Sequence, residues 1–107
     1  MGELLAGVHD NVGHYSARRK EPPYIVWAED VQGSSQESDG KKAWWTQQGT
    51  IDLFTLEEFD PLAERIEDTI NNAGFSWWKS LTDYEDDTGL IHHEWTWEAV
   101  ARYGEQP

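Results

Sequence analysis

The sequence predicts an α+β domain in which a four-stranded antiparallel sheet, made of two hairpins, packs against two helices in the order α-β-β-α-β-β. Two segments rich in β-branched and aromatic residues, 24–30 and 43–55, come first. A capped amphipathic helix follows, and then two further strand-like segments that flank a turn. Because the chain has 107 residues, a single domain spanning 1–107 with one core is expected.

A short helix is expected at the N-terminus, where four apolar residues recur at helical spacing: Leu4, Leu5, Val8 and Val12. The helix should end near Gly13, and residues 14–23 should form a polar linker. Pro22 and Pro23 then favour an extended entry into the first strand.

Residues 31–42 are rich in Gly, Ser and charged side chains, and are predicted to form a long flexible loop between the first two strands. The second strand, 43–55, contains Gly49, which suggests a bulge or a bend.

The segment 61–73 carries the clearest helix signal. Asp60 can cap the first free N–H groups, and Pro61 suits the first helical position because it has no N–H to leave unpaired. Gly74 follows where a left-handed residue commonly ends a helix. One apolar stripe should face the core: Leu62, Ala63, Ile66, Ile70 and Ala73.

The second hairpin is predicted from segments 75–85 and 90–100, which flank the turn-forming tetrapeptide 86–89. The C-terminal residues 101–107 are expected to fray.

The formal net charge is −13, from 21 acidic and 8 basic residues. Such a chain repels nucleic-acid phosphates and anionic membrane surfaces, so binding through phosphate contacts is not expected. There is no cysteine, which excludes disulfides and thiolate metal sites. No stretch has the apolar length of a membrane helix, and the first residues lack the pattern of a signal peptide.

The segment LIHHEWTWE, 90–98, raises the question of a metal or acid–base site. On a strand, His92 and Glu94 share one face, whereas His93 points to the other face with Trp95 and Trp97. The adjacent histidines therefore cannot hold one ion together, and a hydrolytic zinc site needs a third ligand beside His92 and Glu94. No catalytic motif accompanies them, so the prediction is a non-enzyme without cofactor, metal or catalytic residues.

Seven tryptophans are many for one small core, so some are expected at an interface with a partner or another subunit. The candidates are Trp44, Trp45, Trp77, Trp78, Trp95 and Trp97.

Several segments, taken in order, resemble one protein family. They are HYSARRKEPPYIVWAED (14–30), SDGKK (38–42), QGTIDLFT (48–55), DPLAERIEDTINNAGFSWW (60–78) and YEDDTGLIHHEWTWE (84–98). The set is similar to the small tail-completion or tail-terminator proteins of long-tailed, siphovirus-like phages and of prophages in Gram-positive bacteria. The resemblance covers residues 14–100, and the sequence departs from the pattern at its N-terminus and at the Trp44–Trp45 pair.

The resemblance implies a structural virion protein, made in the bacterial cytoplasm, that caps the head-proximal end of the phage tail tube. Such proteins assemble as a ring, commonly of six subunits, which ends tail polymerisation and forms the surface for head–tail joining. The implied partners are copies of the chain itself, the major tail tube protein and a head-completion or connector protein. DNA would pass through the ring without specific binding, and no membrane is involved.

This role gives expectations for individual residues. The loop 31–42 is long enough to order against a neighbouring subunit, through Ser34, Ser35, Asp39, Lys41 and Lys42. Acidic side chains that line the lumen would keep DNA from adhering, and the candidates are Asp52, Glu57 and Glu58.

Two alternatives stay open. An acidic adaptor or DNA-mimic inhibitor would bind a basic nucleic-acid enzyme at low salt and release it at high salt. A small metal hydrolase built on His92 and Glu94 would lose activity on replacement of His92 by Ala, and an unchanged metal content in that variant would argue against it.

Overall fold

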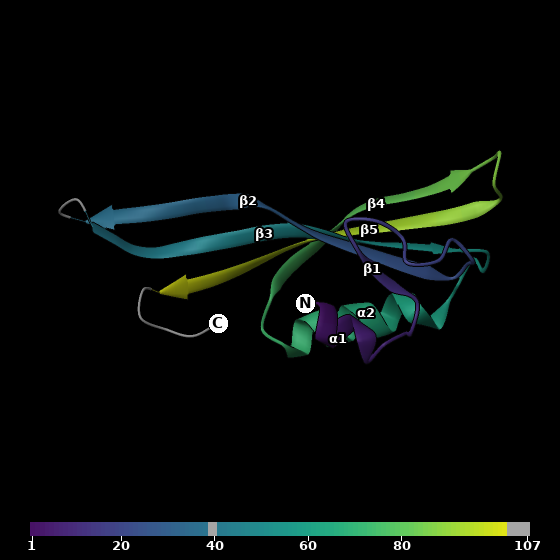
Figure 1. Cartoon of the computed structure of the whole chain (residues 1–107), viewed down its shortest axis with the longest axis horizontal. Coiled ribbons are helices and arrows are strands. Elements are labelled where there is room, and N and C mark those ends of the chain that lie inside the picture. The colour runs from purple at the N-terminus through teal and green to yellow at the C-terminus, as the bar shows by residue number, and fades with distance from the viewer. Residues whose placement is uncertain (39–40, 103–107) are drawn as a thin grey trace.

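A computed structural model describes residues 1–38 and 41–102 as a five-stranded sheet with both helices on one face (Figure 1). The elements are α1 (Gly2–Ala6), β1 (Val12–His14), β2 (Tyr24–Ser38), β3 (Lys41–Thr55), α2 (Pro61–Asn72), β4 (Ser76–Glu85) and β5 (Leu90–Arg102). For residues 31–38, 41–45 and 100–102 only the backbone is described. The strands lie in the order β1-β2-β3-β5-β4.

The prediction of a four-stranded antiparallel sheet is wrong, because a fifth strand, β1, adds to the edge of β2 in parallel. Residues 15–23 connect β1 to β2 without a helix, and they return the chain so that β2 starts beside β1. Gly13 permits this tight return, because a side chain there would collide with the backbone of Ser16 and Arg18. The element order is therefore α-β-β-β-α-β-β.

The N-terminal helix is shorter than the apolar spacing predicts. It ends at Ala6, and Val12 lies in β1. Asn11 is buried and uses its side chain outside any helix: it donates to the carbonyls of Arg19 and Glu21, both at 3.0 Å, and accepts from the amide of Arg19. An Asn that bonds neighbouring backbone in this way competes with helix formation, and here it holds the connection 15–23 against β1.

The flexible loop predicted at 31–42 is also wrong for the described part of that range. Residues 31–38 continue β2 and residues 41–42 begin β3, while 39–40 lie outside the described residues. The strands stay antiparallel through register shifts that follow Glu29, Gln32 and Gln36. Bulges of this kind let a polar, Gly/Ser-rich segment remain paired while it twists.

The two strands form an arm, defined here as residues 29–38 of β2 and 41–49 of β3. The arm extends past the helices to one side of the molecule (Figure 1). It accounts for the elongated shape, which measures 53 × 25 × 21 Å.

The second helix confirms its prediction. Asp60 is the N-cap, Pro61 opens the helix, and Gly74 follows the C-cap with a φ of +88°. Leu62, Ile66 and Ile70 are buried, whereas Ala73, which was expected in the apolar stripe, is exposed at the C-cap.

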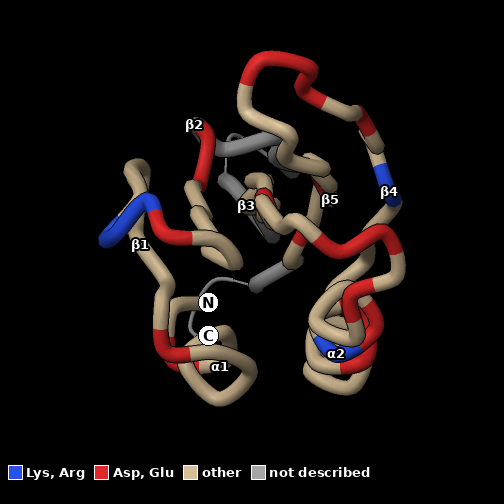
Figure 2. Tube along the Cα trace, turned by 90° about the vertical axis from the view of Figure 1, so that its right-hand side faces the viewer, with Lys and Arg blue, Asp and Glu red and all other residues tan. Residues whose placement is uncertain are grey.

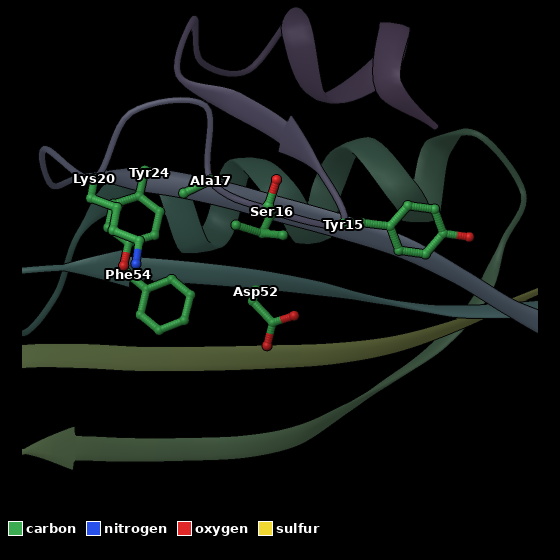
Figure 3. Close-up of a pocket in the computed structure, with 8 residues that line it drawn as sticks. Tyr15, Ser16, Ala17, Lys20, Tyr24, Asp52 and Phe54 are labelled. Atoms are coloured by element: carbon green, nitrogen blue, oxygen red, sulfur yellow. The ribbon is translucent and has the colours of Figure 1, made fainter.

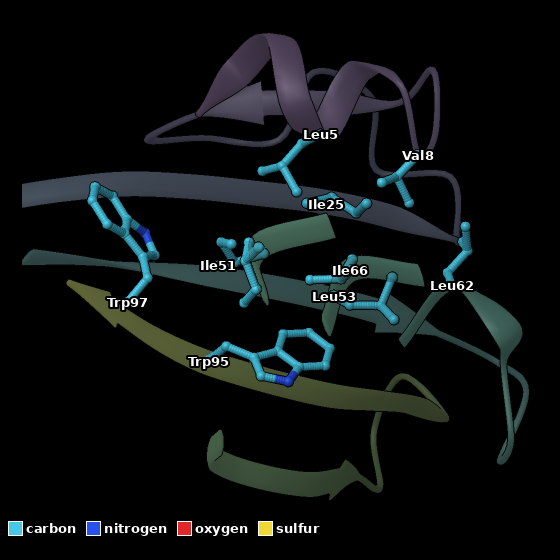
Figure 4. Close-up of a cluster of buried hydrophobic side chains, with 10 residues drawn as sticks. Leu5, Val8, Ile25, Ile51, Leu53, Leu62, Ile66, Trp95 and Trp97 are labelled. Carbon is cyan, nitrogen blue, oxygen red and sulfur yellow. The ribbon is translucent and has the colours of Figure 1, made fainter. Parts of the chain in front are cut away.

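The core lies between the helices and one face of the sheet (Figure 4). Ile51 and Leu53 of β3, Trp95 of β5 and Ile66 of α2 are fully buried there. Gly49 is required beside this core, because a side chain at that position would collide with the carbonyl of Ala28 and the ring of Trp97. The expected bend is thus a site of close approach, and Trp97 covers the bare backbone of the glycine.

The second hairpin is as predicted, with β4 and β5 antiparallel around the turn 86–89. Gly89 has a φ of +72° and donates its N–H to the carbonyl of Glu85 at 2.8 Å. Of the predicted frayed end, residues 101–102 belong to β5, and 103–107 lie outside the described residues. Neither helix in the described residues is long and apolar enough to cross a membrane.

Replacing Asp60 by Ala should lower the free energy of unfolding by about 1–3 kcal/mol. Asp60 Oδ1 accepts from the amide of Leu62 at 2.9 Å and Oδ2 accepts from the hydroxyl of Thr55 at 2.6 Å, so the change removes the cap and strands a buried hydroxyl. Chemical denaturation measures the loss. The exposed Asp68 of α2 is the matched control, and a loss as large in Asp68→Ala would contradict this account.

Candidate functional site

The face of the sheet away from the helices carries the candidate site, and we call it the open face. Successive side chains of a strand point to opposite faces of the sheet, so the residues between the buried ones point away from the core. The open face is formed by Tyr24, Val26, Asp52, Phe54, Trp78, Leu81, His92, Glu94 and Thr96.

Three of these side chains converge at the middle of the open face. Asp52 on β3 pairs in register with Glu94 on β5, and the neighbouring register position joins Phe54 to His92. His92 Nε2 lies 2.6 Å from Asp52 Oδ1, a hydrogen bond in which the ring N–H donates to the carboxylate. Potential ligand atoms of Asp52, His92 and Glu94 all lie within 4.8 Å of one another, and the three residues are half-buried. We call them the Asp–His–Glu triad.

Neighbouring side chains hold the triad in place. The ring of Phe54 stacks on His92 with centroids 4.3 Å apart, and Tyr24 stacks on Phe54 at 4.8 Å. Ser80, at the bulge of β4, donates its hydroxyl to Glu94 Oε1 at 2.8 Å. Both the imidazole and one carboxylate are therefore oriented by contacts outside the triad.

Charge within the triad is unbalanced. Burial raises the pKa of Asp52, and the nearby carboxylate of Glu94 raises it further, whereas the hydrogen bond and charge of His92 lower it. Asp52 therefore has the imidazole of His92 and a second carboxylate, Glu94, beside it in a partly desolvated place.

A hollow of about 450 Å³ adjoins the triad between the connection 15–23 and the sheet (Figure 3). Asp52 belongs to both the triad and the hollow. The hollow is lined by Tyr15, Ser16, Ala17, Lys20, Tyr24, Val26, Asp52 and Phe54.

The sequence correctly placed His92 and Glu94 on one face, but it missed Asp52 as their third partner. Asp52 is 40 residues from His92 in the chain, and it joins the pair only because β3 lies beside β5. A signal was present in the sequence: Asp52 is the polar residue between the apolar residues Ile51 and Leu53, so it had to lie on the face opposite the core. It would meet His92 and Glu94 once the two hairpins were joined through β3 and β5.

His93 lies on the opposite face, as predicted, and is 6% exposed. Its ring stacks on Trp95 with centroids 5.8 Å apart. Within the described residues, neither ring nitrogen has a hydrogen-bond partner. Burial lowers the pKa of His93, and Lys79 and His92 lower it further, against the opposing charges of Asp60 and Glu67.

The candidate interface tryptophans divide between the core and the surface. Trp95 and Trp97 are buried, and the indole of Trp95 donates to Glu67 at 2.8 Å. Trp77 is half-buried, and Trp78 is 48% exposed on the open face. Trp44 and Trp45 lie in residues 41–45 of β3, for which only the backbone is described.

The candidate assembly-loop residues are in strands, not in a loop. Ser34 and Ser35 belong to β2, and Lys41 and Lys42 belong to β3. Asp39 lies outside the described residues.

The candidate lumen acids do not form one group. Glu57 and Glu58 are exposed in the turn between β3 and α2. Asp52 is 18% exposed and engages His92. The same turn carries two exposed apolar residues, Leu56 at 62% and Phe59 at 87%, and we call 56–59 the apolar turn.

Acidic residues are spread over the surface (Figure 2). They lie at the β4–β5 turn and along much of α2, drawn in red, while the basic residues after β1, drawn in blue, form a small separate group.

No protein-family model matches the sequence, and no curated protein is significantly similar to it. The features described above therefore stand on geometry and chemistry alone.

Replacing His93 by Gln should make the stability of the protein less sensitive to acid. Because the folded state holds this imidazole with a lowered pKa, protonation favours the unfolded chain, and stability falls as the pH drops below the ordinary value of 6.5. Denaturation at pH 7.5 and pH 5.5 measures the change. The loss between these pH values should be smaller in His93→Gln than in the natural chain, and an equal loss in both would contradict the expectation.

Proposed function

We propose that this chain is a structural tail-terminator-like protein, which caps the head-proximal end of a phage tail tube as a ring and forms the surface for head–tail joining. The resemblance over residues 14–100 suggests the role. The observation that carries it is the arm, because a subunit that closes into a ring needs a surface that reaches its neighbour.

The arm offers a specific means of contact. β1 pairs only with residues 25–27 of β2, so beyond Trp27 the outer edge of β2 has no strand beside it within the described residues. An unpaired edge presents backbone N–H and C=O groups that a strand from another chain can bond. Subunit contact by strand addition would bury this edge without needing a large apolar surface.

Exposed apolar side chains supply further contact area. Phe59 and Leu56 project from the apolar turn, and Trp78 projects from β4, an edge strand. Large aromatic side chains are enriched in the buried centres of protein interfaces. These residues would be covered by the tube protein, a connector protein or a neighbouring copy.

The acidic surface suits a channel for DNA. Glu57 and Glu58 are exposed and uncompensated by ion pairs among the described residues, so they are the lumen candidates that the geometry favours. Carboxylates along a channel repel phosphate and let DNA slide. The competing function, a DNA-mimic inhibitor, draws on exposed acids at the turn end of the second hairpin: Asp83 of β4, and Asp86 and Asp87 of the β4–β5 turn.

The decisive experiment adds the purified chain to polymerising tail tubes and examines them by electron microscopy. We expect a ring at one end of each tube and a fixed tube length. Tubes of unaltered length with bare ends would refute the proposal. Salt-reversible capture of a basic nucleic-acid enzyme, with no effect on tubes, would instead support the DNA-mimic function.

Replacing Phe59 by Ser should weaken capping at least about tenfold while leaving the free energy of unfolding within about 0.5 kcal/mol, because the side chain is 87% exposed. Capping is measured as the concentration that gives half-maximal tube-length control. Tyr84→Ser is the matched control, since Tyr84 is also an exposed aromatic, at 59%. Equal capping by the natural chain and Phe59→Ser would remove the apolar turn from the interface.

A further inference from the structure

We propose that the Asp–His–Glu triad binds one divalent transition-metal ion, with Asp52, His92 and Glu94 as its protein ligands. The site lies within one subunit, so this inference does not depend on the proposed role in phage tails. It adds a binding site that the sequence did not predict, because the sequence offered only two ligands on one face.

The spacing fits a metal ion after a small adjustment. Ligand atoms about 2.0–2.2 Å from one ion lie about 3.0–3.6 Å from each other. The potential ligand atoms of the triad lie within 4.8 Å of one another, and His92 Nε2 is 2.6 Å from Asp52 Oδ1. Binding would therefore lengthen the His92–Asp52 contact by about 0.5–1 Å and draw Glu94 inward, which side-chain rotation on three fixed strand positions can provide.

The ligand set selects the kind of ion. An imidazole nitrogen favours Zn²⁺, Fe²⁺ or Cu²⁺ over Ca²⁺ and Mg²⁺, and carboxylates add charge neutralisation. Ca²⁺ usually takes six to eight oxygen ligands, which one imidazole and two carboxylates do not supply. Three protein ligands also leave at least one coordination position for water, and the hollow beside Asp52 gives that position space (Figure 3).

The local charge independently points to a cation. Among the described residues, no Lys or Arg forms an ion pair with Asp52 or Glu94, and His92 is the only ion-pair partner of Asp52. Two half-buried carboxylates, Asp52 and Glu94, thus lie beside each other, and in the described part of the chain Asp52 alone has the imidazole of His92 as an ion-pair partner. Charges removed from water need compensation, and a divalent ion at their centre would provide it.

The surroundings resemble the support that metal ligands usually have. Ser80 donates to Glu94, and Thr96 donates to Ser80 at 3.1 Å, so a short hydrogen-bonded chain orients this carboxylate. Phe54 fixes the plane of the His92 ring. Outer partners of this kind stiffen a site and strengthen binding.

A second histidine–carboxylate pair on the same chain provides an internal comparison. His14 Nε2 lies 3.0 Å from Glu29, but the pair is more exposed, and no third ligand joins it in the described residues. If a histidine beside a carboxylate were sufficient, both places would bind metal equally.

The test is isothermal titration of the purified full chain with Zn²⁺ and, separately, with Mg²⁺. We expect one Zn²⁺ site per chain and no comparable Mg²⁺ binding. Glu94→Gln and Asp52→Asn should each weaken Zn²⁺ binding at least about tenfold, and Ser80→Ala by roughly tenfold. Glu98→Gln is the matched control, because it removes the same charge from the same face of β5 and should bind as the natural chain does.

Thermal unfolding without metal identifies any variant that fails to fold. The isosteric Asp52→Asn should fold, because it removes one of two neighbouring negative charges. Addition of Zn²⁺ should raise the unfolding temperature of the natural chain and of Glu98→Gln, but not of folded Asp52→Asn. Absence of stoichiometric Zn²⁺ binding to the natural chain would overturn the proposal. Equal affinity in Glu94→Gln and Glu98→Gln, or loss of binding only in His14→Asn, would overturn it as well.

Discussion

The pairing of β3 with β5 is the constraint on which the rest of the structure depends. It joins the two hairpins into one sheet and fixes Ile51 opposite Trp95 and Asp52 opposite Glu94. Because side chains alternate, this one register sends the first pair into the core and the second to the open face. A slip of one residue would bury carboxylates against α2 and expose the largest side chain of the core.

The two faces of the sheet consequently serve different purposes. The helix face contains the apolar side chains that stabilise the fold, and α2 is fixed over it by the cap at Asp60 and its bond to Thr55. Among the described residues both helices lie on the other face, so exposed side chains of the open face, such as Trp78, can contact a partner. The arm continues both strands beyond the core and leaves the outer edge of β2 available.

The tail-terminator proposal and the metal proposal use different parts of the molecule. The first depends on the arm, the apolar turn and acidic surface residues, and the second on three side chains in the middle of the open face. Asp52 was a lumen candidate, but its side chain contacts His92 in the triad. Glu57 and Glu58, which lie in the apolar turn, are the exposed acids among the three candidates. A metal site within the subunit would stiffen the pairing of β3 with β5, which also supports the arm.

The sequence by itself determined the features that depend on local interactions: helix 61–72 with its Asp60–Pro61 start and Gly74 end, the turn at 86–89, and the opposite orientation of His92 and His93. It misjudged 4–12, 31–38 and 41–42, because apolar spacing and a Gly/Ser-rich composition do not reveal that Asn11 bonds the backbone or that a polar segment stays paired. Only the tertiary structure decided the fifth strand, the arm and the triad. The fifth strand and the triad each bring together residues that are not neighbours in the chain, such as Val12 with Ile25 and Asp52 with His92. The arm is a local hairpin that extends past the helices, and its Gly/Ser-rich composition does not reveal that it stays paired. The free energy that aligns β3 with β5 comes from burying the apolar side chains of the core beneath the helices.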